Sequence, residues 1–358
     1  MRFKILVACT MLSLAVLLVL AGCVKKSGTP GSSTTSNVSL TGAGATFPYP
    51  IYSKWFDTYG NSTGVRINYQ SIGSGAGIQQ LKAKTVDFGA SDAPLSDEEM
   101  KDMPSEVVHI PTVAGAVVLT YNIKGVSKGL RLTPEIVSGI FLGHVKTWDD
   151  PAIKKANPAL KLPAQPVFVT HRSDGSGTSF IFTNYLAAVS SEWKSSVGAG
   201  KSVKWPAGIG GKGNEGVSGL VKQTPGAIGY VELAYAVQNK LPYAEVQNQA
   251  GQFIEPSIKS TTAAANGAVE AIKKDIRALI VNSPEKDAYP IAGFTYILLY
   301  KDQSNPSKAK ALVDFLEWAI HDGQKMAAPL LYSPLPANVV SIDDQNLKSI
   351  TVNGKPVI

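Results

Sequence analysis

Four short glycine-rich segments recur along this 358-residue chain, and three of them also contain serine or threonine. We interpret each as a loop between a strand and a helix. Glycine allows the backbone to turn sharply and to approach a ligand closely. The start of a helix offers unpaired N–H groups and a partial positive charge. The arrangement therefore predicts an α/β fold and a site for a small anion. The four segments are "GAGATF" (42–47), "GSGAG" (73–77), "SDGSGTS" (173–179) and "GIGGKGNEG" (208–216). From the residues alone, the last of these could equally be a surface loop.

The pattern of apolar residues around these segments predicts alternating strands and helices. The strands are expected at 37–44, 64–75, 114–123, 165–172, 226–233 and 289–301, with a short strand beginning at 86. The helices are expected at 48–60, 77–84, 133–143 and 308–323, with another beginning near Ser96. Gly60 and Gly323 are the expected stops of two of these helices. Such alternation predicts about two α/β domains with mainly parallel sheets.

The first residues have the composition of an export signal. Arg2 and Lys4 precede an apolar run that ends in "LAGC" (20–23), so residues 1–22 are predicted to be a signal peptide. "LAGC" is similar to the bacterial lipobox, which implies lipidation at Cys23 and an extracytoplasmic, membrane-anchored protein at the cell surface or in a periplasm. Residues 23–37, rich in Ser, Thr, Gly and Pro, are expected to be a flexible tether.

Composition excludes several classes of protein. The one cysteine besides Cys23 is Cys9, inside the predicted signal peptide, so no disulfide is expected after processing. The formal charge of +7 is scattered, with no run of Lys or Arg longer than two, which argues against nucleic-acid binding. No later apolar stretch approaches the length of a transmembrane helix.

Enzymatic interpretations of the glycine-rich segments fail on their motifs. Neither Ser74 nor Ser176 lies in the G-x-S-x-G of a nucleophile elbow. Around Lys212 the spacing of a P-loop is missing, because Pro206 replaces its first glycine. "GAGATF" lacks the third glycine of a dinucleotide-binding fingerprint. No pair of histidines has the spacing of metal ligands, so neither metal nor cofactor is expected.

Three charged residues stand out near the predicted anion site. Arg172 and Asp174 flank the start of a helix, and Asp92 follows a predicted strand in "GASDAPLS". An aspartate beside an anion site is unexpected, since it would repel the ligand. From the residues alone, the Arg172–Asp174 pair could be structural, and Asp92 could be a turn or helix-capping residue.

The motifs as a set resemble those of the PstS family, the phosphate-binding proteins of the bacterial ABC phosphate importer. The resemblance covers essentially all of residues 38–340, in the family's order and spacing. It rests on "LTGAGATFPYPIYSKW", "INYQSIGSGAGIQQL", "VDFGASDAPLS", "HRSDGSGTSFIFTNYL", "EWKSSVGAGKSVKWPAGIGGKGNEGV" and "PGAIGYVELAYA".

The resemblance implies a type II periplasmic-binding-protein fold. Two α/β domains, 38–117 plus 295–358 and 118–294, would be joined by a two-strand hinge and would close on the ligand between them. The implied partners are inorganic phosphate, the permease subunits of the importer with their cytoplasmic ATPase, and the membrane through the lipid anchor. No cofactor, metal or catalysis is implied. The implied phosphate-binding residues are Thr46, Phe47, Ser74, Asp92, Arg172, Ser176, Gly177 and Thr178, with Asp174 holding Arg172.

The same resemblance gives Asp92 a role. A phosphate that still carries a proton near neutral pH can donate it to a carboxylate (the second pKa of phosphoserine is about 6), whereas sulfate cannot. Asp92 is therefore expected to select phosphate over sulfate. Two alternatives remain: a binding protein for another oxyanion, such as sulfate or molybdate, and a secreted phosphatase.

Overall fold

The computed structural model describes residues 38–358. The predicted signal peptide, the predicted lipidation site Cys23 and the predicted tether lie outside the described residues. The strands are β1 (Ser39–Gly44), β2 (Arg66–Ser71), β3 (Phe88–Ser91), β4 (Val107–Tyr121), β5 (Arg131–Leu132), β6 (Phe168–Arg172), β7 (Ile209–Gly211), β8 (Ala227–Glu232), β9 (Glu245–Gln247), β10 (Phe253–Ile254), β11 (Ala292–Tyr300), β12 (Asp302–Gln303), β13 (Thr351–Val352) and β14 (Lys355–Pro356).

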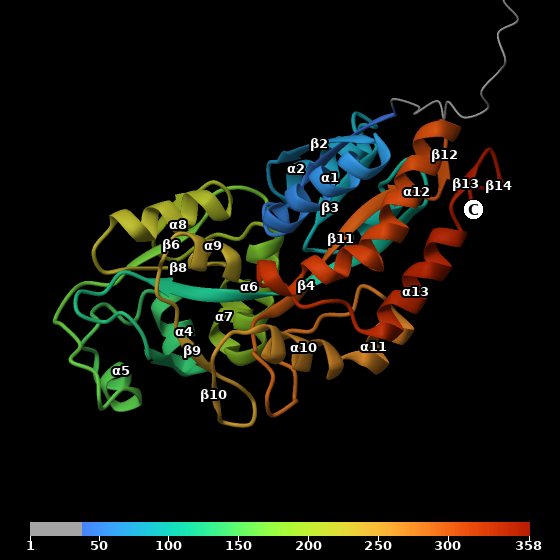
Figure 1. The fold of residues 1–358 in the computed structure, drawn as a ribbon. Helices are drawn as coiled ribbons and strands as arrows, with labels where there is room; N and C mark the ends of the chain where they lie inside the picture. The colour runs from blue at the N-terminus through green and yellow to red at the C-terminus, as the bar shows by residue number, and fades with distance from the viewer. Residues whose placement is uncertain (1–37) are drawn as a thin grey trace, which may run out of the picture. The chain divides into compact units, whose positions relative to one another are not determined.

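Helices separate most of these strands, as the alternation of the sequence predicts (Figure 1). They are α1 (Tyr49–Thr63), α2 (Ser74–Lys82), α3 (Asp97–Lys101), α4 (Pro134–Phe141), α5 (Pro151–Ala156), α6 (Gly177–Val189), α7 (Ser191–Ser196), α8 (Gly213–Gln223), α9 (Leu233–Gln238), α10 (Ile258–Asn266), α11 (Val269–Lys274), α12 (Pro306–Ile320) and α13 (Ala337–Lys348), with the 3-10 helices η1 (Asp322–Met326) and η2 (Ala328–Leu330).

The largest sheet has eight strands in the order β2-β1-β3-β11-β4-β8-β6-β7. Its two ends are parallel, since β1 pairs with β2 and β3, and β6 pairs with β7 and β8. The centre is antiparallel, because β11 and β4 run against their neighbours. The expectation of mainly parallel sheets is therefore wrong for the middle of this sheet.

The long strand β4 connects the two ends of the sheet (Figure 1). Its residues up to Ala116 pair with β11, and those from Val117 onward pair with β8. The change of partner falls where the resemblance places the boundary between two domains. The described residues nevertheless form one compact unit, so the division into two domains stays a prediction.

An aromatic cluster joins the two ends of the described chain. The face of α1 predicted from Tyr52, Trp55, Phe56 and Tyr59 is buried. Phe315 of α12 lies with its ring centroid 5.4 Å from that of Phe56. Edge-to-face and tilted aromatic contacts at such distances stabilise a core beyond the area they bury.

Two helices end at other residues than the expected glycines. Helix α1 continues through Gly60 to Thr63 and ends at Gly64, whose φ of 79° suits the left-handed turn. Helix α12 ends at Ile320, with His321 as its C-cap, and Gly323 lies in η1. The carbonyl of Gly323 accepts a hydrogen bond from Trp55 Nε1 at 2.8 Å, so this glycine is held by tertiary contact.

Candidate functional site

Thr46 and Phe47 lie in the turn that connects β1 to α1, and both are buried. Among the described residues, neither backbone N–H has a hydrogen-bond partner. The Thr46 hydroxyl oxygen accepts hydrogen bonds from the backbone N–H and the side-chain amide of Asn214, at 3.1 and 2.7 Å. Buried N–H groups without a partner are rare in folded proteins, so these two indicate a place for an acceptor from outside the chain.

Ser74 is the first residue of α2 and connects two distant parts of the chain. Its hydroxyl oxygen accepts the backbone N–H of Gly177 at 3.0 Å and that of Asp92 at 3.3 Å. The next residue, Gly75, donates its N–H to the Gly175 carbonyl at 2.8 Å. A Cβ on Gly75 would lie 3.1 Å from the Cα of Gly175, so glycine allows this close approach.

Asp92 follows β3 and is 3% exposed. Its Oδ1 accepts a hydrogen bond from the hydroxyl of Thr295 at 2.7 Å. Burial raises the pKa of Asp92 to about 7, and this desolvation outweighs the opposing effects of the Thr295 hydroxyl and the Arg172 charge. The carboxyl group adjoins Gly177, where a Cβ would lie 2.5 Å from Asp92 Oδ2.

Arg172 ends β6, and Asp174 holds its guanidinium by two hydrogen bonds. The third contact of the guanidinium runs from Nη1 to the Thr178 hydroxyl at 3.3 Å. Asp174 also accepts the backbone N–H of Gly213 at 3.0 Å. Burial would raise the pKa of Asp174, but the hydrogen bonds and charge of Arg172 outweigh it, and the pKa lies below its usual value.

Ser176, Gly177 and Thr178 form the start of α6, as the loop pattern predicts. Ser176 is the N-cap, and its hydroxyl accepts the backbone N–H of Ser179 at 3.0 Å. The Thr178 hydroxyl accepts from Arg172 and from the side-chain amide of Asn214, the latter at 3.1 Å. This segment therefore adjoins the turn of Thr46, Ser74 and Asp92, and the structure brings all the predicted site residues together.

The hydroxyl protons of this cluster are uncommitted. Within residues 38–358, Thr46, Ser74, Ser176 and Thr178 accept in every hydrogen bond that their hydroxyls make. Each O–H therefore remains available to donate. Around the carboxyl group of Asp92 the cluster offers four hydroxyl donors, two backbone N–H donors and the buried guanidinium of Arg172, which is paired with Asp174. This is a donor set for a small oxyanion.

Two residues of the cluster were not predicted as site residues. Asn214 donates to both Thr46 and Thr178, and its Oδ1 accepts the backbone N–H of Glu232 at 2.8 Å. Its position in "GIGGKGNEG", at the start of α8, is the signal that could have indicated it. Thr295, in the middle of β11, has no comparable local signal.

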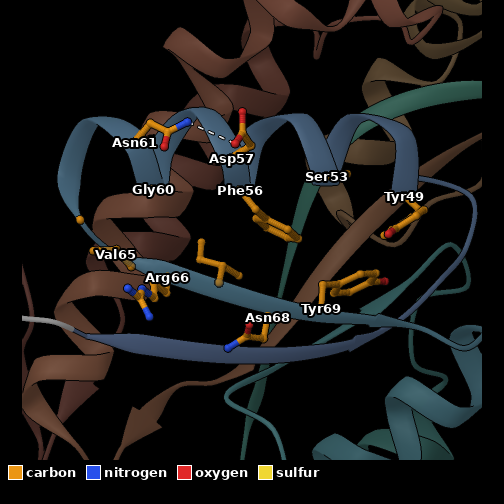
Figure 2. A pocket seen from close by; sticks show the side chains of 12 residues that line it. Tyr49, Ser53, Phe56, Asp57, Gly60, Asn61, Val65, Arg66, Asn68 and Tyr69 are labelled. Carbon is orange, nitrogen blue, oxygen red and sulfur yellow. Dashed lines mark hydrogen bonds between the residues drawn. The ribbon is translucent and has the colours of Figure 1, made fainter.

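A hollow of about 600 Å³ lies elsewhere, between α1 and β2 (Figure 2). Tyr49 and Tyr69 lie at one end of it, with ring centroids 6.3 Å apart. None of its lining residues belongs to the predicted site. In the part of the chain that the structure describes, no group of three His, Cys, Asp or Glu side chains could hold a metal, and no helix could span a membrane.

The sequence matches known families over most of its length. The family model of the PBP superfamily domain matches residues 29–322. The phosphate-binding protein PstS of Xylella fastidiosa is 48% identical over 312 residues, which cover 87% of this chain and 85% of the relative. Its namesake in Haemophilus influenzae is 49% identical, covering 85% of this chain and 90% of the relative. The relatives named here are binding proteins by name.

Solved structures show the same fold at lower identity. A high affinity periplasmic phosphate-binding protein, solved with bound phosphate, is 21% identical with a TM-score of 0.68, covering 85% of this chain and 92% of that one. A DING protein is 18% identical with a TM-score of 0.71, covering 88% of this chain and 99% of that one. The predicted type II periplasmic-binding-protein fold is thereby confirmed. By its sequence and its fold, the chain belongs to the PstS family of the PBP superfamily.

Proposed function

We propose that this protein binds inorganic phosphate outside the cytoplasm and delivers it to the permease of an ABC phosphate importer. The observation that carries the proposal is the set of uncommitted donors around Asp92. Oxygen atoms of phosphate can accept from the hydroxyls of Thr46, Ser74, Ser176 and Thr178, from the N–H groups of Thr46 and Phe47, and from Arg172. The curated relatives carry the name phosphate-binding protein.

Asp92 supplies the selectivity in this proposal. Its Oδ1 is occupied by Thr295, and among the described residues Oδ2 has no hydrogen-bond partner. A protonated phosphate oxygen can donate to this carboxylate, whereas sulfate has no proton to offer and is repelled. This selection requires the deprotonated carboxylate, which the raised pKa of Asp92 makes the main form only above about pH 7.

The remaining parts of the proposal concern domains, anchoring and catalysis. We propose that 38–117 plus 295–358 and 118–294 are two domains that close on phosphate, because Ser74 and Thr46 contact Gly177 and Asn214 across that division. The protein would be held at the membrane by a lipid on Cys23, either at the cell surface or in a periplasm. It would have no catalytic activity, since within residues 38–358 none of the four hydroxyls of the cluster is hydrogen-bonded to a carboxylate or a histidine that could take its proton.

Equilibrium titration of the phosphate-free protein with phosphate and with sulfate tests the proposal. The unmodified protein is expected to bind phosphate with a micromolar or lower Kd and sulfate far more weakly. Asp92→Asn removes the repulsion between the carboxylate and sulfate. We expect this variant to show a smaller difference between the Kd for phosphate and the Kd for sulfate. Tight sulfate binding by the unmodified protein would instead favour a sulfate-binding protein, and turnover of a phosphomonoester would favour a phosphatase.

A second pair of variants checks that the site is where we propose. Arg172→Ala is expected to weaken phosphate binding at least tenfold, because it removes a charge-assisted donor (about 1.5–3 kcal/mol). Arg131→Ala is the matched control, since Arg131 is an exposed arginine paired with Glu245 in another sheet. Equal affinities of the two variants would mean that the phosphate site lies elsewhere.

A further inference from the structure

Three tyrosine hydroxyls bond to three consecutive carbonyls of the turn that carries Thr46 and Phe47. Tyr69 donates to the carbonyl of Ala45 at 2.7 Å. Tyr235 donates to that of Thr46 at 2.6 Å, which is the shorter of its two contacts, the other being to Glu215 Oε1 at 3.0 Å. Tyr332 donates to that of Phe47 at 2.7 Å. We refer to Tyr69, Tyr235 and Tyr332 as the clamp tyrosines.

The clamp tyrosines come from distant parts of the chain. Tyr69 lies on β2, where Figure 2 shows its ring beneath α1, Tyr235 lies in α9, and Tyr332 follows η2. Tyr235 and Tyr332 are buried, and Tyr69 is partly buried. Three separate segments therefore converge on one turn, and each contributes a single hydroxyl.

We propose that the clamp tyrosines are positioning residues for the anion site. This inference rests on the proposed function, because it concerns how the turn is set to receive phosphate. A peptide group is planar, and in its trans form the carbonyl and the N–H of the next residue point in opposite directions. Holding a carbonyl on one side therefore fixes the direction of the following N–H on the other.

The planarity assigns a separate task to each tyrosine. The carbonyl held by Tyr69 belongs to the same peptide as the Thr46 N–H, and the carbonyl held by Tyr235 to the same peptide as the Phe47 N–H. These are the two amides that lack a partner among the described residues. The carbonyl held by Tyr332 precedes Pro48, which has no N–H, so Tyr332 keeps this oxygen from turning toward an anion.

The tyrosines are suited to donating. Burial raises the pKa of Tyr69, of Tyr235 and of Tyr332, so all three keep their protons at neutral pH. Tyr332 also lies 3.1 Å from Oε2 of Glu232, whose pKa burial raises well above its usual range. The Phe47 carbonyl is the nearer of the two acceptors of the Tyr332 hydroxyl, at 2.7 Å against 3.1 Å for Glu232.

The three contacts differ in how easily they can be replaced. The Thr46 carbonyl also accepts the backbone N–H of Tyr49 at 3.1 Å, so it keeps one partner without Tyr235. For the carbonyls of Ala45 and Phe47, the structure gives no second donor within residues 38–358. Removing the hydroxyl of Tyr69 or Tyr332 is therefore expected to disturb the turn more than removing that of Tyr235.

The test replaces each clamp tyrosine by phenylalanine, which keeps the ring and removes the hydroxyl. Tyr69→Phe and Tyr332→Phe are expected to weaken phosphate binding by about tenfold, and Tyr235→Phe by less. Tyr300→Phe is the matched control, because Tyr300 is also buried and donates to a carbonyl, that of Leu81, at 2.8 Å. Its phosphate affinity is expected to stay within about twofold of the unmodified protein.

Backbone amide spectra separate positioning from a general loss of structure. In the phosphate-free protein, Tyr69→Phe is expected to shift the Thr46 amide signal, and Tyr235→Phe the Phe47 signal. Saturating phosphate should bring both back toward their positions in the unmodified protein. Unchanged affinity and unchanged amide signals in a protein that binds phosphate would overturn the inference. A failure of the unmodified protein to bind phosphate would instead overturn the proposed function.

Discussion

Arg172 and Asp174 form a doubly hydrogen-bonded ion pair across a single intervening residue, with Nε 2.8 Å from Oδ1 and Nη2 2.6 Å from Oδ2. The side chain of Arg172 is 1% exposed and that of Asp174 13% exposed. The planar guanidinium is thus fixed in one orientation, which places Nη1 against Thr178. Asp174 neutralises an arginine that would otherwise be a buried, unpaired charge in the absence of ligand.

The first prediction concerns this pair. Asp174→Asn leaves the charge of Arg172 without its counterion, and we expect the free energy of unfolding of the phosphate-free protein to fall by about 2–4 kcal/mol. Phosphate affinity should change by less than about tenfold, because two effects oppose each other. The arginine is less restrained, but a negative charge is removed from the neighbourhood of the anion. Urea unfolding and calorimetric titration of the same samples measure both quantities.

Arg131 and Glu245 offer a comparison for this prediction. Their ion pair has Nε 3.0 Å from Oε2, with the arginine side chain 53% exposed. Glu245→Gln should lower the free energy of unfolding by no more than about 1 kcal/mol, as is usual for an exposed pair. If Asp174→Asn and Glu245→Gln lowered the free energy of unfolding by the same amount, burial would not explain how much the Arg172–Asp174 pair contributes to stability.

The sequence predicted the parts of the site that depend on local structure. The start of α6 at Ser176 to Thr178 and the start of α2 at Ser74 follow from glycine and hydroxyl residues between a strand and a helix. These residues meet because the helices begin at the ends of parallel strands on each side of the sheet. Loops of this kind encode both the backbone conformation and the donors.

The rest of the site depends on contacts between residues far apart in the sequence. The Thr295 hydroxyl reaches Asp92 across 203 positions, and Tyr332 reaches Phe47 across 285. Nothing near either residue in the sequence specifies its partner. The antiparallel centre of the sheet was missed for the same reason, because an apolar strand such as β11 has the same local pattern in either direction.

The second prediction concerns the pH dependence of stability. The usual pKa of an aspartate is about 3.9, and burial raises that of Asp92 to about 7 in the folded protein. Between these values the folded protein binds more protons than the unfolded chain, so the contribution of Asp92 is fully present below pH 4. This contribution to the free energy of unfolding is lost as the pH rises through 7, by at most about 1.4 kcal/mol for each pH unit.

Asp92→Asn isolates this contribution, because asparagine does not titrate and can still accept from Thr295. We expect the free energy of unfolding of the variant, relative to that of the unmodified protein, to increase between pH 4.5 and pH 8. Urea unfolding in phosphate-free buffer at several pH values measures the difference. A constant difference over this range would show that the pKa of Asp92 in the folded protein is near its usual value.

The third prediction concerns an ion pair that crosses the proposed division between domains. Lys201 Nζ lies 2.6 Å from Glu99 Oε1, and both side chains are partly exposed. Lys201→Gln is expected to speed phosphate release by no more than about fivefold, because such pairs contribute up to about 1 kcal/mol. Stopped-flow measurements of phosphate release at low and high salt check this. Because salt screens the ion pair, the difference in release rate between Lys201→Gln and the unmodified protein should be smaller at high salt. An effect that persists in high salt would contradict an electrostatic role.

The fourth prediction concerns the approach of Gly177 to Asp92. A Cβ at Gly177 would lie 2.6 Å from the backbone nitrogen of Asp92, so one backbone segment must move. Gly177→Ala should therefore separate the segments, lose the hydrogen bond from the Gly177 N–H to Ser74, and weaken phosphate binding by about tenfold or more. If the two segments belong to domains that can open, the phosphate-free variant should retain most of its stability.

Gly219→Ala is the control for this substitution, because a Cβ at Gly219 in α8 meets no atom within 4 Å. Alanine favours a helix over glycine, so we expect this variant to gain up to about 1 kcal/mol in free energy of unfolding with unchanged phosphate affinity. Calorimetric titration and urea unfolding of both variants give the comparison. Normal phosphate affinity in Gly177→Ala would mean that phosphate binds without the close approach of Gly177 to Asp92, and the closed arrangement would not be the one that holds the anion.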